Sequence, residues 1–335
     1  MTLSFAACGR RLPALLPLAG LLFGLACAVP SASAQQRNPQ QRVSNTIFEQ
    51  KAESYRFERF TLDSPDGQRR WQVNIGIPAR AGKAPAPVLY MLDGNAAALV
   101  MDQPLLTQLA ARAAPVLVFI GYDNDLRIDS PARTTDYTAW IDRADDENGT
   151  PAVVGGGAFA FQDLIERRIK PEVEKRANID RGRQALWGHS LGGLFVLSSL
   201  YTRPAAFQYY VAASPSLWWS QGAPLGDMEQ QFLANQHGQK AHVWVMLGGA
   251  ERTGDRGTRD LTNPRVVAHL RRIGGATPDA AMQLSQRLAK VPGLEVQYRE
   301  FDGLGHGPML QASLQATLAA LYGVDDRSKA APAQP

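Results

Sequence analysis

One short motif limits the fold of this chain more than any other feature of the sequence. Residues 188–192 read Gly-His-Ser-Leu-Gly, which matches G-x-S-x-G, and they stand between a short apolar run and an apolar segment of helical length. A serine on a sharp turn between a strand and a helix has a strained backbone, and side chains at Gly188 and Gly192 would collide with it. The motif therefore predicts that Ser190 is a nucleophile, although a glycine-rich turn capped by a serine is the alternative. The N–H of Leu191, which opens the helix, is predicted to hold a developing oxyanion.

Short apolar runs alternate with helix-length segments along the rest of the chain. Residues 55–62 and 71–77 alternate like antiparallel strands joined across a turn. The later apolar runs are 88–92, 116–121, 184–187, 209–213, 243–247 and 295–301, and the helix-length segments are 158–177, 191–201, 264–289 and 308–321. This rhythm predicts a mainly parallel central sheet with helices on both faces and N-terminal antiparallel strands. Together with the G-x-S-x-G turn between strand and helix, it predicts an α/β-hydrolase fold.

The first 34 residues have the order of a secretory signal. Arg10 and Arg11 precede an apolar stretch over 12–29, and Ala32-Ser33-Ala34 resembles a cleavage site. We therefore expect a signal peptide over 1–34, export to the periplasm, and no stable membrane insertion after cleavage. A retained anchor, a twin-arginine signal and a lipoprotein anchored at Cys27 are the alternatives.

Composition narrows the class of the mature protein. Both cysteines, Cys8 and Cys27, lie in the predicted leader, so the mature chain would fold without disulfides. About 300 residues would remain, which is enough for one large domain with its own core. The leader holds two arginines and no acids, so the net charge of +4 becomes +2 (4 − 2) after cleavage. With no block of Lys and Arg among aromatics, we expect no nucleic-acid partner.

We expect one α/β-hydrolase domain over 51–325, between flexible segments at 35–50 and 326–335. Within it, residues 123–157 contain few apolar residues, and a long connection without its own structure is predicted to be a lid or a substrate loop. This segment begins Asp123-Asn124-Asp125, but Ile128 and Thr134 stand where a calcium loop needs Gly and Glu. Its acidic residues are predicted to be solvated. We predict neither a metal nor a cofactor.

A serine nucleophile needs an imidazole that accepts its proton. His306 is the predicted base, because it lies after the last strand in a glycine-rich turn before Pro308 and follows the nucleophile in the order of this fold. His189 adjoins Ser190, but consecutive residues in a tight turn point apart. The remaining histidines, His237, His242 and His269, have the pattern of surface or helix residues, and no H-E-x-x-H motif or Cys pair indicates zinc.

Glu251 is the predicted acid that orients the imidazole, because it follows the run 243–247 at the end of a strand. Asp255, Asp260 and Asp302 are alternatives, and so is a Ser–His dyad without a carboxylate. The second oxyanion donor is expected from the backbone of Gly94 or Asn95, directly after the run 88–92.

Four segments, in this order, resemble the putative esterase family. They read Leu-Tyr-Met-Leu-Asp-Gly-Asn at 89–95, Arg-Thr-Thr-Asp-Tyr-Thr at 133–138, Leu-Trp-Gly-His-Ser-Leu-Gly-Gly-Leu at 186–194, and Ala-Ser-Pro-Ser-Leu-Trp-Trp at 213–219. The family includes feruloyl-type esterases, S-formylglutathione hydrolases and siderophore esterases. The leader and the stretch 133–138 are most similar to periplasmic enterobactin-type trilactone esterases. The resemblance implies that Ser190 and His306 are catalytic. Some siderophore esterases work with a Ser–His pair, so it leaves Glu251 open.

The resemblance also implies that Arg133 lines the substrate cleft. A ferric or iron-free catecholate siderophore is anionic and aromatic, so Arg133 with Trp218 or Trp219 would suit it through charge and cation–π contacts. Alternatively, Arg133 pairs with Asp136 and holds the loop, and the tryptophans pack in the core.

The expected function is therefore that of an exported serine esterase that cleaves a catecholate trilactone siderophore, a small-molecule ester. The alternatives are a general aryl, feruloyl or carbohydrate acyl esterase, and a binding or acyl-transfer protein on the same fold. The sequence makes no prediction of the oligomeric state.

Overall fold

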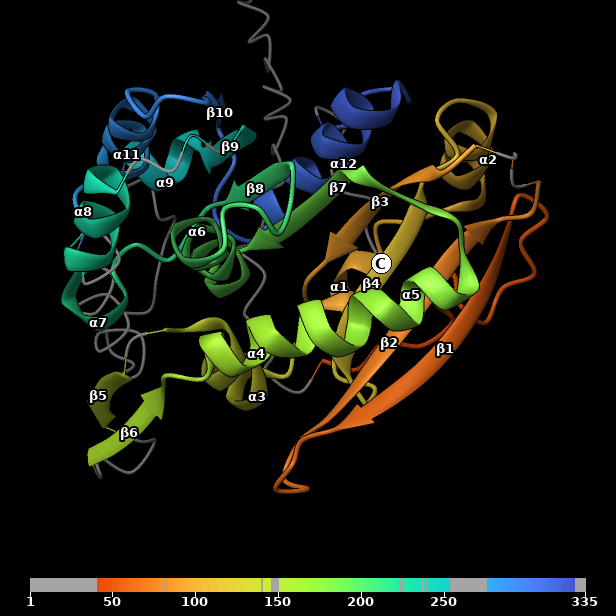
Figure 1. Cartoon of the computed structure of the whole chain (residues 1–335), viewed down its shortest axis with the longest axis horizontal. Coiled ribbons are helices and arrows are strands. Elements are labelled where there is room, and N and C mark those ends of the chain that lie inside the picture. The colour runs from red at the N-terminus through yellow and green to blue at the C-terminus, as the bar shows by residue number, and fades with distance from the viewer. Residues whose placement is uncertain are drawn as a thin grey trace, which may run out of the picture. The chain divides into compact units, whose positions relative to one another are not determined.

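An eight-stranded sheet with the order β1-β2-β4-β3-β7-β8-β9-β10 organises the chain in this computed structural model (Figure 1). β1 pairs with β2 and β2 with β4 in antiparallel fashion, whereas the other neighbours are parallel. The predicted fold class is thus confirmed. The strands are β1 Tyr55–Asp63, β2 Arg70–Pro78, β3 Ala86–Met91, β4 Val116–Tyr122, β7 Ile179–His189, β8 Tyr209–Ala213, β9 Ala241–Gly248 and β10 Leu294–Phe301.

The structure describes residues 41–80, 82, 84–139, 141–145, 151–222, 226–235, 238, 240–253 and 276–328. The predicted signal peptide, residues 35–40 of the predicted N-terminal segment and residues 329–335 of the predicted tail lie outside these ranges. Among the residues described, no helix is long and apolar enough to cross a membrane.

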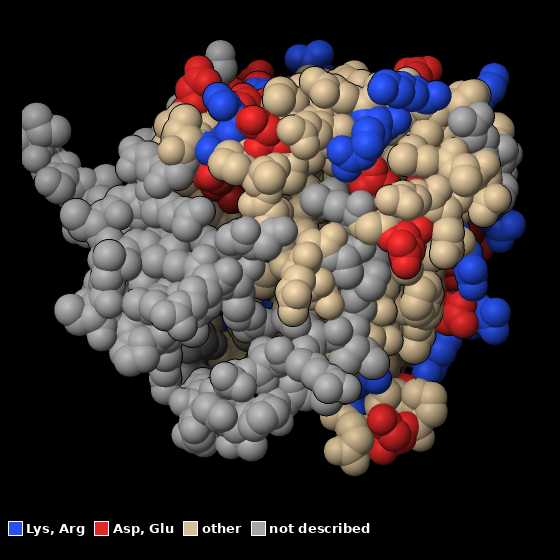
Figure 2. Space-filling view, turned by 90° about the vertical axis from the view of Figure 1, so that its left-hand side faces the viewer, with Lys and Arg blue, Asp and Glu red and all other residues tan. Residues whose placement is uncertain are grey.

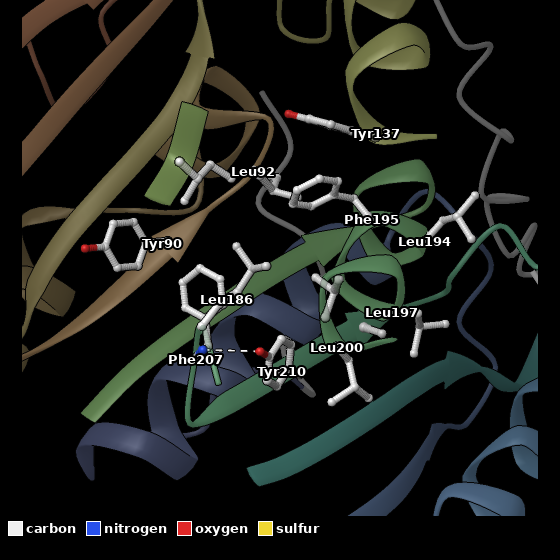
Figure 3. Packing of buried hydrophobic residues seen from close by; sticks show 14 of the residues in the cluster. Tyr90, Leu92, Tyr137, Leu186, Leu194, Phe195, Leu197, Leu200, Phe207 and Tyr210 are labelled. Carbon is white, nitrogen blue, oxygen red and sulfur yellow. Dashed lines mark hydrogen bonds between the residues drawn. The ribbon is translucent and has the colours of Figure 1, made fainter. Parts of the chain in front are cut away.

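Side chains of the sheet alternate between two apolar cores. On β3, Val88 and Tyr90 belong to one core and Leu89 and Met91 to the other, because successive side chains of a strand point to opposite faces. The first core includes residues of α4, α5, α6, α8 and α11, and Figure 3 shows Phe195 within it. The second includes residues of α1, α2 and α12. These helices are α1 Gly94–Ala98, α2 Gln103–Ala111, α4 Ala158–Leu164, α5 Lys170–Arg176, α6 Leu191–Thr202, α8 Asp227–Ala234, α11 Ala280–Leu288 and α12 Met309–Tyr322.

The helix expected over 158–177 is present as α4 and α5, which a π-helical stretch over Ile165–Ile169 joins into the long rod that crosses the view in Figure 1. Of the helix expected over 264–289, the described residues include α11, and residues 264–275 lie outside them. Helices α1 and α2 were not predicted. The signal for α2 was present, since Asp102 accepts a hydrogen bond from the N–H of Leu105 and caps the helix.

Residues 123–157 have more structure than the sequence predicted. They contain α3 (Ser130–Tyr137) and an antiparallel pair, β5 (Ile141–Asp145) and β6 (Pro151–Gly155). The expectation of a connection without its own structure was therefore wrong over these stretches. Asp129 accepts a hydrogen bond from the N–H of Ala132 at 3.0 Å and caps α3, which begins Ser-Pro. An Asp before a proline at the first turn is a helix start signal that the count of apolar residues overlooks.

Charges of both signs are distributed over the described part of the face in Figure 2, with Lys and Arg among Asp and Glu. This part of the surface therefore shows no extended patch of one charge of the kind that nucleic-acid binding uses.

Candidate active site

Ser190 stands at the turn between β7 and α6 with φ 63° and ψ −119°. The turn is tight because a Cβ atom at Gly188 would lie 2.4 Å from the carbonyl oxygen of Gly192. Outside its own helix, a Cβ at Gly192 would meet no atom nearer than 3.5 Å, so the predicted collision is not found with the rest of the structure. The second tight position is Gly193, where a Cβ would lie 2.7 Å from the carbonyl oxygen of Ala213. The steric demand of the elbow therefore falls on Gly188 and Gly193.

Three residues predicted from the sequence form one hydrogen-bonded line. The Oγ of Ser190 lies 2.9 Å from Nε2 of His306, and Nδ1 of His306 lies 2.6 Å from Oε2 of Glu251. Ser190 follows β7, Glu251 lies in α9 (Gly249–Thr253) after β9, and His306 follows β10. Because the carboxyl ends of parallel strands share one edge of a sheet, residues far apart in the sequence meet there.

The surroundings of Glu251 determine where protons lie among Ser190, His306 and Glu251. Its Oε1 accepts hydrogen bonds from Oγ of Ser214 at 2.6 Å and from the N–H of Gly248 at 3.1 Å. Burial by itself would raise the pKa of Glu251, but the hydrogen bond and charge of His306, together with these two donors, hold that pKa below its usual value. An ionised carboxylate only accepts hydrogen bonds, so Nδ1 of His306 donates to it. In the neutral ring Nε2 is then free to accept the proton of Ser190.

None of the alternative acids and bases among the described residues takes the place of Glu251 or His306. Asp302 is exposed, and in the described structure it makes no hydrogen bond to His306. On β9, Nδ1 of His242 lies 3.0 Å from Oε2 of Glu295. Nε2 of His189 lies 2.9 Å from the carbonyl oxygen of His306. The remaining candidates, Asp255, Asp260, His237 and His269, lie outside the described residues.

Two serines that follow β8 also join the site, and neither was predicted from the sequence as a site residue. Ser214 donates to Glu251, while Oγ of Ser216 lies 3.3 Å from Oγ of Ser190. The N–H of Ser216 also donates to the carbonyl oxygen of Ser190 at 3.1 Å. Their signal was their position, because the run 209–213 ends at the same sheet edge as the nucleophile and the acid.

The predicted oxyanion amides lie at the starts of two helices. Leu191 opens α6, while Gly94 and Asn95 open α1, and neither helix has a side-chain cap. First-turn amides have no partner in the preceding turn of their own helix. The Nδ2 of Asn95 donates to the carbonyl oxygens of Asn124 and Leu126 at 3.0 and 2.9 Å, so its side chain is engaged with that loop. Its backbone amide remains a candidate donor beside that of Gly94.

Arg133 is buried, and its partner is Asp93 rather than Asp136. Its Nε and Nη2 donate to Oδ1 and Oδ2 of Asp93, both at 2.8 Å, and Nη2 also donates to the carbonyl oxygen of His189 at 3.1 Å. Burial by itself would lower the pKa of Arg133, but the charge and hydrogen bonds of Asp93 raise it. The predicted role as a cation that faces the substrate remains a prediction, and this placement counts against it.

Asp136 is bound elsewhere. It accepts hydrogen bonds from Nε1 of Trp71 at 2.7 Å and from Oη of Tyr122 at 3.0 Å, and it forms an ion pair with Arg69. These contacts fasten α3 to β2 and β4.

The two tryptophans differ in placement. Trp219 is 2% exposed and belongs to the first core, whereas Trp218 is partly exposed and packs against that core. Their ring centroids lie 6.0 Å apart. Trp219 therefore packs in the core, which is the alternative given above to a substrate contact. A substrate contact remains a prediction for Trp218. Among the described residues, no group of three or more His, Cys, Asp or Glu side chains could hold a metal ion.

Comparison with known proteins gives a consistent group of relatives. The model of the family described as putative esterase matches residues 64–320. The apo-salmochelin esterase of Escherichia coli O6:H1 is 34% identical over 316 residues, which cover 92% of this chain and 92% of that protein. The ferri-bacillibactin esterase BesA of Bacillus subtilis is 30% identical over 269 residues, which cover 77% of this chain and 86% of that protein. The solved structure of the enterobactin and salmochelin hydrolase IroE has a TM-score of 0.61 at 32% identity, covering 82% of this chain and 98% of IroE.

Proposed function

The chain belongs to the putative esterase family and is a serine hydrolase related to the siderophore esterases, and from this premise we propose that it hydrolyses the ester bonds of a catecholate trilactone siderophore. The observation that carries the chemistry is the hydrogen-bonded line of Ser190, His306 and Glu251. This line has the parts of an activated serine nucleophile, namely a hydroxyl, a neutral imidazole that accepts its proton, and a carboxylate that orients the imidazole.

In the first half of the proposed reaction, Oγ of Ser190 attacks the carbonyl carbon of the ester while its proton passes to Nε2 of His306. The imidazolium that forms is stabilised by Glu251, whose carboxylate already accepts from Nδ1. The tetrahedral intermediate places its negative oxygen near the N–H of Leu191 and an N–H of the turn at Gly94 and Asn95. When the intermediate collapses, the serine hydroxyl of the lactone leaves with the proton from His306.

In the second half of the reaction, water hydrolyses the acyl enzyme. His306, neutral again, takes a proton from water, and the hydroxide attacks the acyl carbon bound to Ser190. Collapse frees a carboxylic acid and returns the proton to Ser190. Three such cycles would open a trilactone and divide it into single serine-catecholate units.

The proposed substrate rests on the relatives. Their names state esterase or hydrolase activity on apo-salmochelin, ferri-bacillibactin, and enterobactin and salmochelin. The chain covers 92% of the length of the first of these proteins, so the likeness is not confined to the elbow.

We also propose that the reaction takes place in the periplasm. The support is the order of charged, apolar and small residues over 1–34. Expression with the intact leader followed by fractionation and mass measurement checks this. A mature protein that begins near Gln35 in the periplasmic fraction supports export, and a full-length protein in the cytoplasmic fraction contradicts it.

A hydrolysis panel tests the substrate assignment. The wild-type protein is incubated with a catecholate triserine trilactone in ferric and iron-free forms, a feruloyl ester and an aryl acetate, and the products are separated by liquid chromatography and weighed by mass spectrometry. Linear serine-catecholate products formed faster than ferulate support the proposal. Rapid release of ferulate with an intact trilactone would move the assignment to a general acyl esterase, and acyl groups found on an added sugar would indicate a transferase.

A further inference from the structure

The buried contacts of Arg133 connect two segments that each carry a predicted oxyanion amide. Its guanidinium is bidentate on the carboxylate of Asp93, and its Nη2 also reaches the carbonyl oxygen of His189. The two side chains are only 8% and 2% exposed. Asp93 directly precedes Gly94 and Asn95, and His189 is two residues before Leu191. One side chain therefore bridges the backbone segments from which both donors come.

The sheet leaves these two segments close but otherwise weakly joined. β3 and β7 are parallel neighbours, with Met91 opposite Trp187. The last backbone hydrogen bond between them runs from the N–H of Leu92 to the carbonyl oxygen of Trp187, at 3.1 Å. Beyond that bond the chain after β3 leaves the sheet, whereas β7 continues to His189 beside β8, and Arg133 bonds to both segments at that point.

Asp93 needs such support because its backbone is strained. It has φ 51° and ψ 53°, the left-handed region that a residue with a Cβ atom disfavours. Its N–H donates to Oη of Tyr137 at 3.1 Å, and Tyr137 lies one turn after Arg133 on α3. Helix α3 thus binds both the backbone and the side chain of Asp93.

We propose that Arg133 is a positioning residue that fixes the distance between the two oxyanion amides by clamping Asp93 to the carbonyl group of His189. The clamp, defined as Arg133, Asp93, Tyr137 and the carbonyl group of His189, acts on the donors rather than on the substrate. The carboxylate of Asp93 balances the positive charge of Arg133, so the pair presents no net charge to a ligand. This inference rests on the proposed acyl-enzyme chemistry but not on the siderophore as substrate.

A positioning role and a substrate-binding role predict different kinetics. Misplaced oxyanion donors weaken an interaction that forms only in the transition state, so kcat falls while KM changes little, whatever the charge of the substrate. A cation that binds an anionic substrate instead acts mainly through KM and on anionic substrates alone. Loss of one oxyanion donor costs roughly 10²–10³ in kcat, which sets the upper range for breaking the clamp.

The experiment compares Arg133→Gln, Arg133→Lys and Asp93→Asn on a neutral aryl acetate and on its analogue with a sulfonate on the ring. We expect Arg133→Gln and Asp93→Asn to lower kcat by roughly 30-fold to 10³-fold equally on both esters, with KM within about threefold. Lysine keeps the charge but not the bidentate fork, so Arg133→Lys should fall between wild type and Arg133→Gln. The affinity for an aryl boronic acid, which forms a tetrahedral adduct on Ser190, should fall in parallel with kcat.

Arg287→Gln is the matched control. Arg287 is bidentate on the buried carboxylate of Glu229, at 2.5 and 3.1 Å, so this variant breaks a pair of the same kind on α11 and α8, away from the two segments that carry the oxyanion amides. Removing this charge should leave kcat on the neutral ester within about twofold. Thermal melts establish that each variant is folded. If Arg133→Gln does not fold, Arg133→Lys and Asp93→Asn, which conserve charge or shape, give the same comparison.

The inference is overturned if the Arg133 variants raise KM on the sulfonated ester alone, or if folded variants keep wild-type kcat on both esters. Wild-type protein that cleaves neither ester and binds no boronic acid would overturn the proposed function, and the clamp with it.

Discussion

Two hydrogen-bonded groups meet at the elbow, and they use charge differently. The line of Ser190, His306 and Glu251 comes from the ends of β7, β9 and β10, and its protons move during the proposed reaction. The clamp comes from the end of β3 and from α3, and its guanidinium gives up no proton in the reaction, because the charge and hydrogen bonds of Asp93 raise the already high pKa of Arg133. The comparison teaches that burial alone does not identify a catalytic charge. Substitutions in the line should change turnover and its pH dependence, whereas substitutions in α3 should change turnover without a new pH dependence, or stability alone.

The largest effect is expected from the residues that exchange the proton. Ser190→Ala and His306→Ala should each lower kcat by roughly 10⁴–10⁶, and the double variant should lose little more, because the two groups act as a unit. Steady-state hydrolysis of an aryl acetate measures this, with circular dichroism as the control for the fold. A variant that keeps more than a hundredth of the activity would remove its residue from the line.

Glu251→Gln tests whether the line has a third member. The amide cannot stabilise the imidazolium, so kcat should fall by roughly 10²–10⁴ while KM stays nearly unchanged. The loss should be the same on neutral and sulfonated esters. A loss below about threefold would reduce the line to a Ser–His dyad and give the carboxylate a structural role.

Ser214→Ala should have a smaller effect on turnover, and it should shift the pH dependence of stability in a defined direction. Its hydrogen bond lowers the pKa of Glu251, so its removal raises that pKa toward the usual range. A carboxylate whose folded pKa is depressed contributes stability above its unfolded pKa and loses that contribution as pH falls through the folded value. In Ser214→Ala this stability should therefore be lost at a higher pH than in wild type. At neutral pH we expect kcat to fall by about threefold to tenfold, which corresponds to about 0.7–1.4 kcal/mol, the range of an ordinary hydrogen bond. Urea unfolding as a function of pH measures the shift, and the same pH dependence of the free energy of unfolding in both proteins would contradict it.

Asp136→Ala sharpens the comparison within α3 and should affect turnover least. It leaves Nε1 of Trp71 and Oη of Tyr122 without their acceptor, so we expect the free energy of unfolding to fall by about 2–4 kcal/mol. The kcat of the folded protein should stay within about threefold of wild type. Urea unfolding and kinetics on the same preparation measure both. A loss of kcat as large as that of Arg133→Gln would mean that the whole helix, rather than the clamp, positions the site.

Local signals in the sequence predicted much of the fold and of the line. The elbow motif, the apolar runs and the glycine-rich turn before Pro308 predicted the sheet and the positions of Ser190 and His306. The run 243–247 predicted the position of Glu251. Each of these predictions depends on chain order and on the shared edge of a parallel sheet, both of which can be read from one sequence.

The partners of buried polar groups could not be predicted in this way. The sequence offered Asp136 as the pairing alternative for Arg133, because the two residues are close along the chain. The observed partner is Asp93, and that choice depends on how α3 packs on the sheet. Likewise, Ser214 could be assigned to Glu251 only once β8 was known to lie between β7 and β9. The steric need for Gly193 rather than Gly192 depends on where the end of β8 approaches the elbow.

The most direct test of the account is covalent labelling with a fluorophosphonate, which reacts with a serine whose proton an imidazole accepts. The protein is treated with the reagent and digested, and the modified peptide is identified by mass spectrometry. The account predicts a single adduct, on the peptide that contains Ser190, and its formation should be abolished in Ser190→Ala and slowed by orders of magnitude in His306→Ala. An adduct on any other serine, or undiminished labelling of the Ser190→Ala protein, would contradict the account.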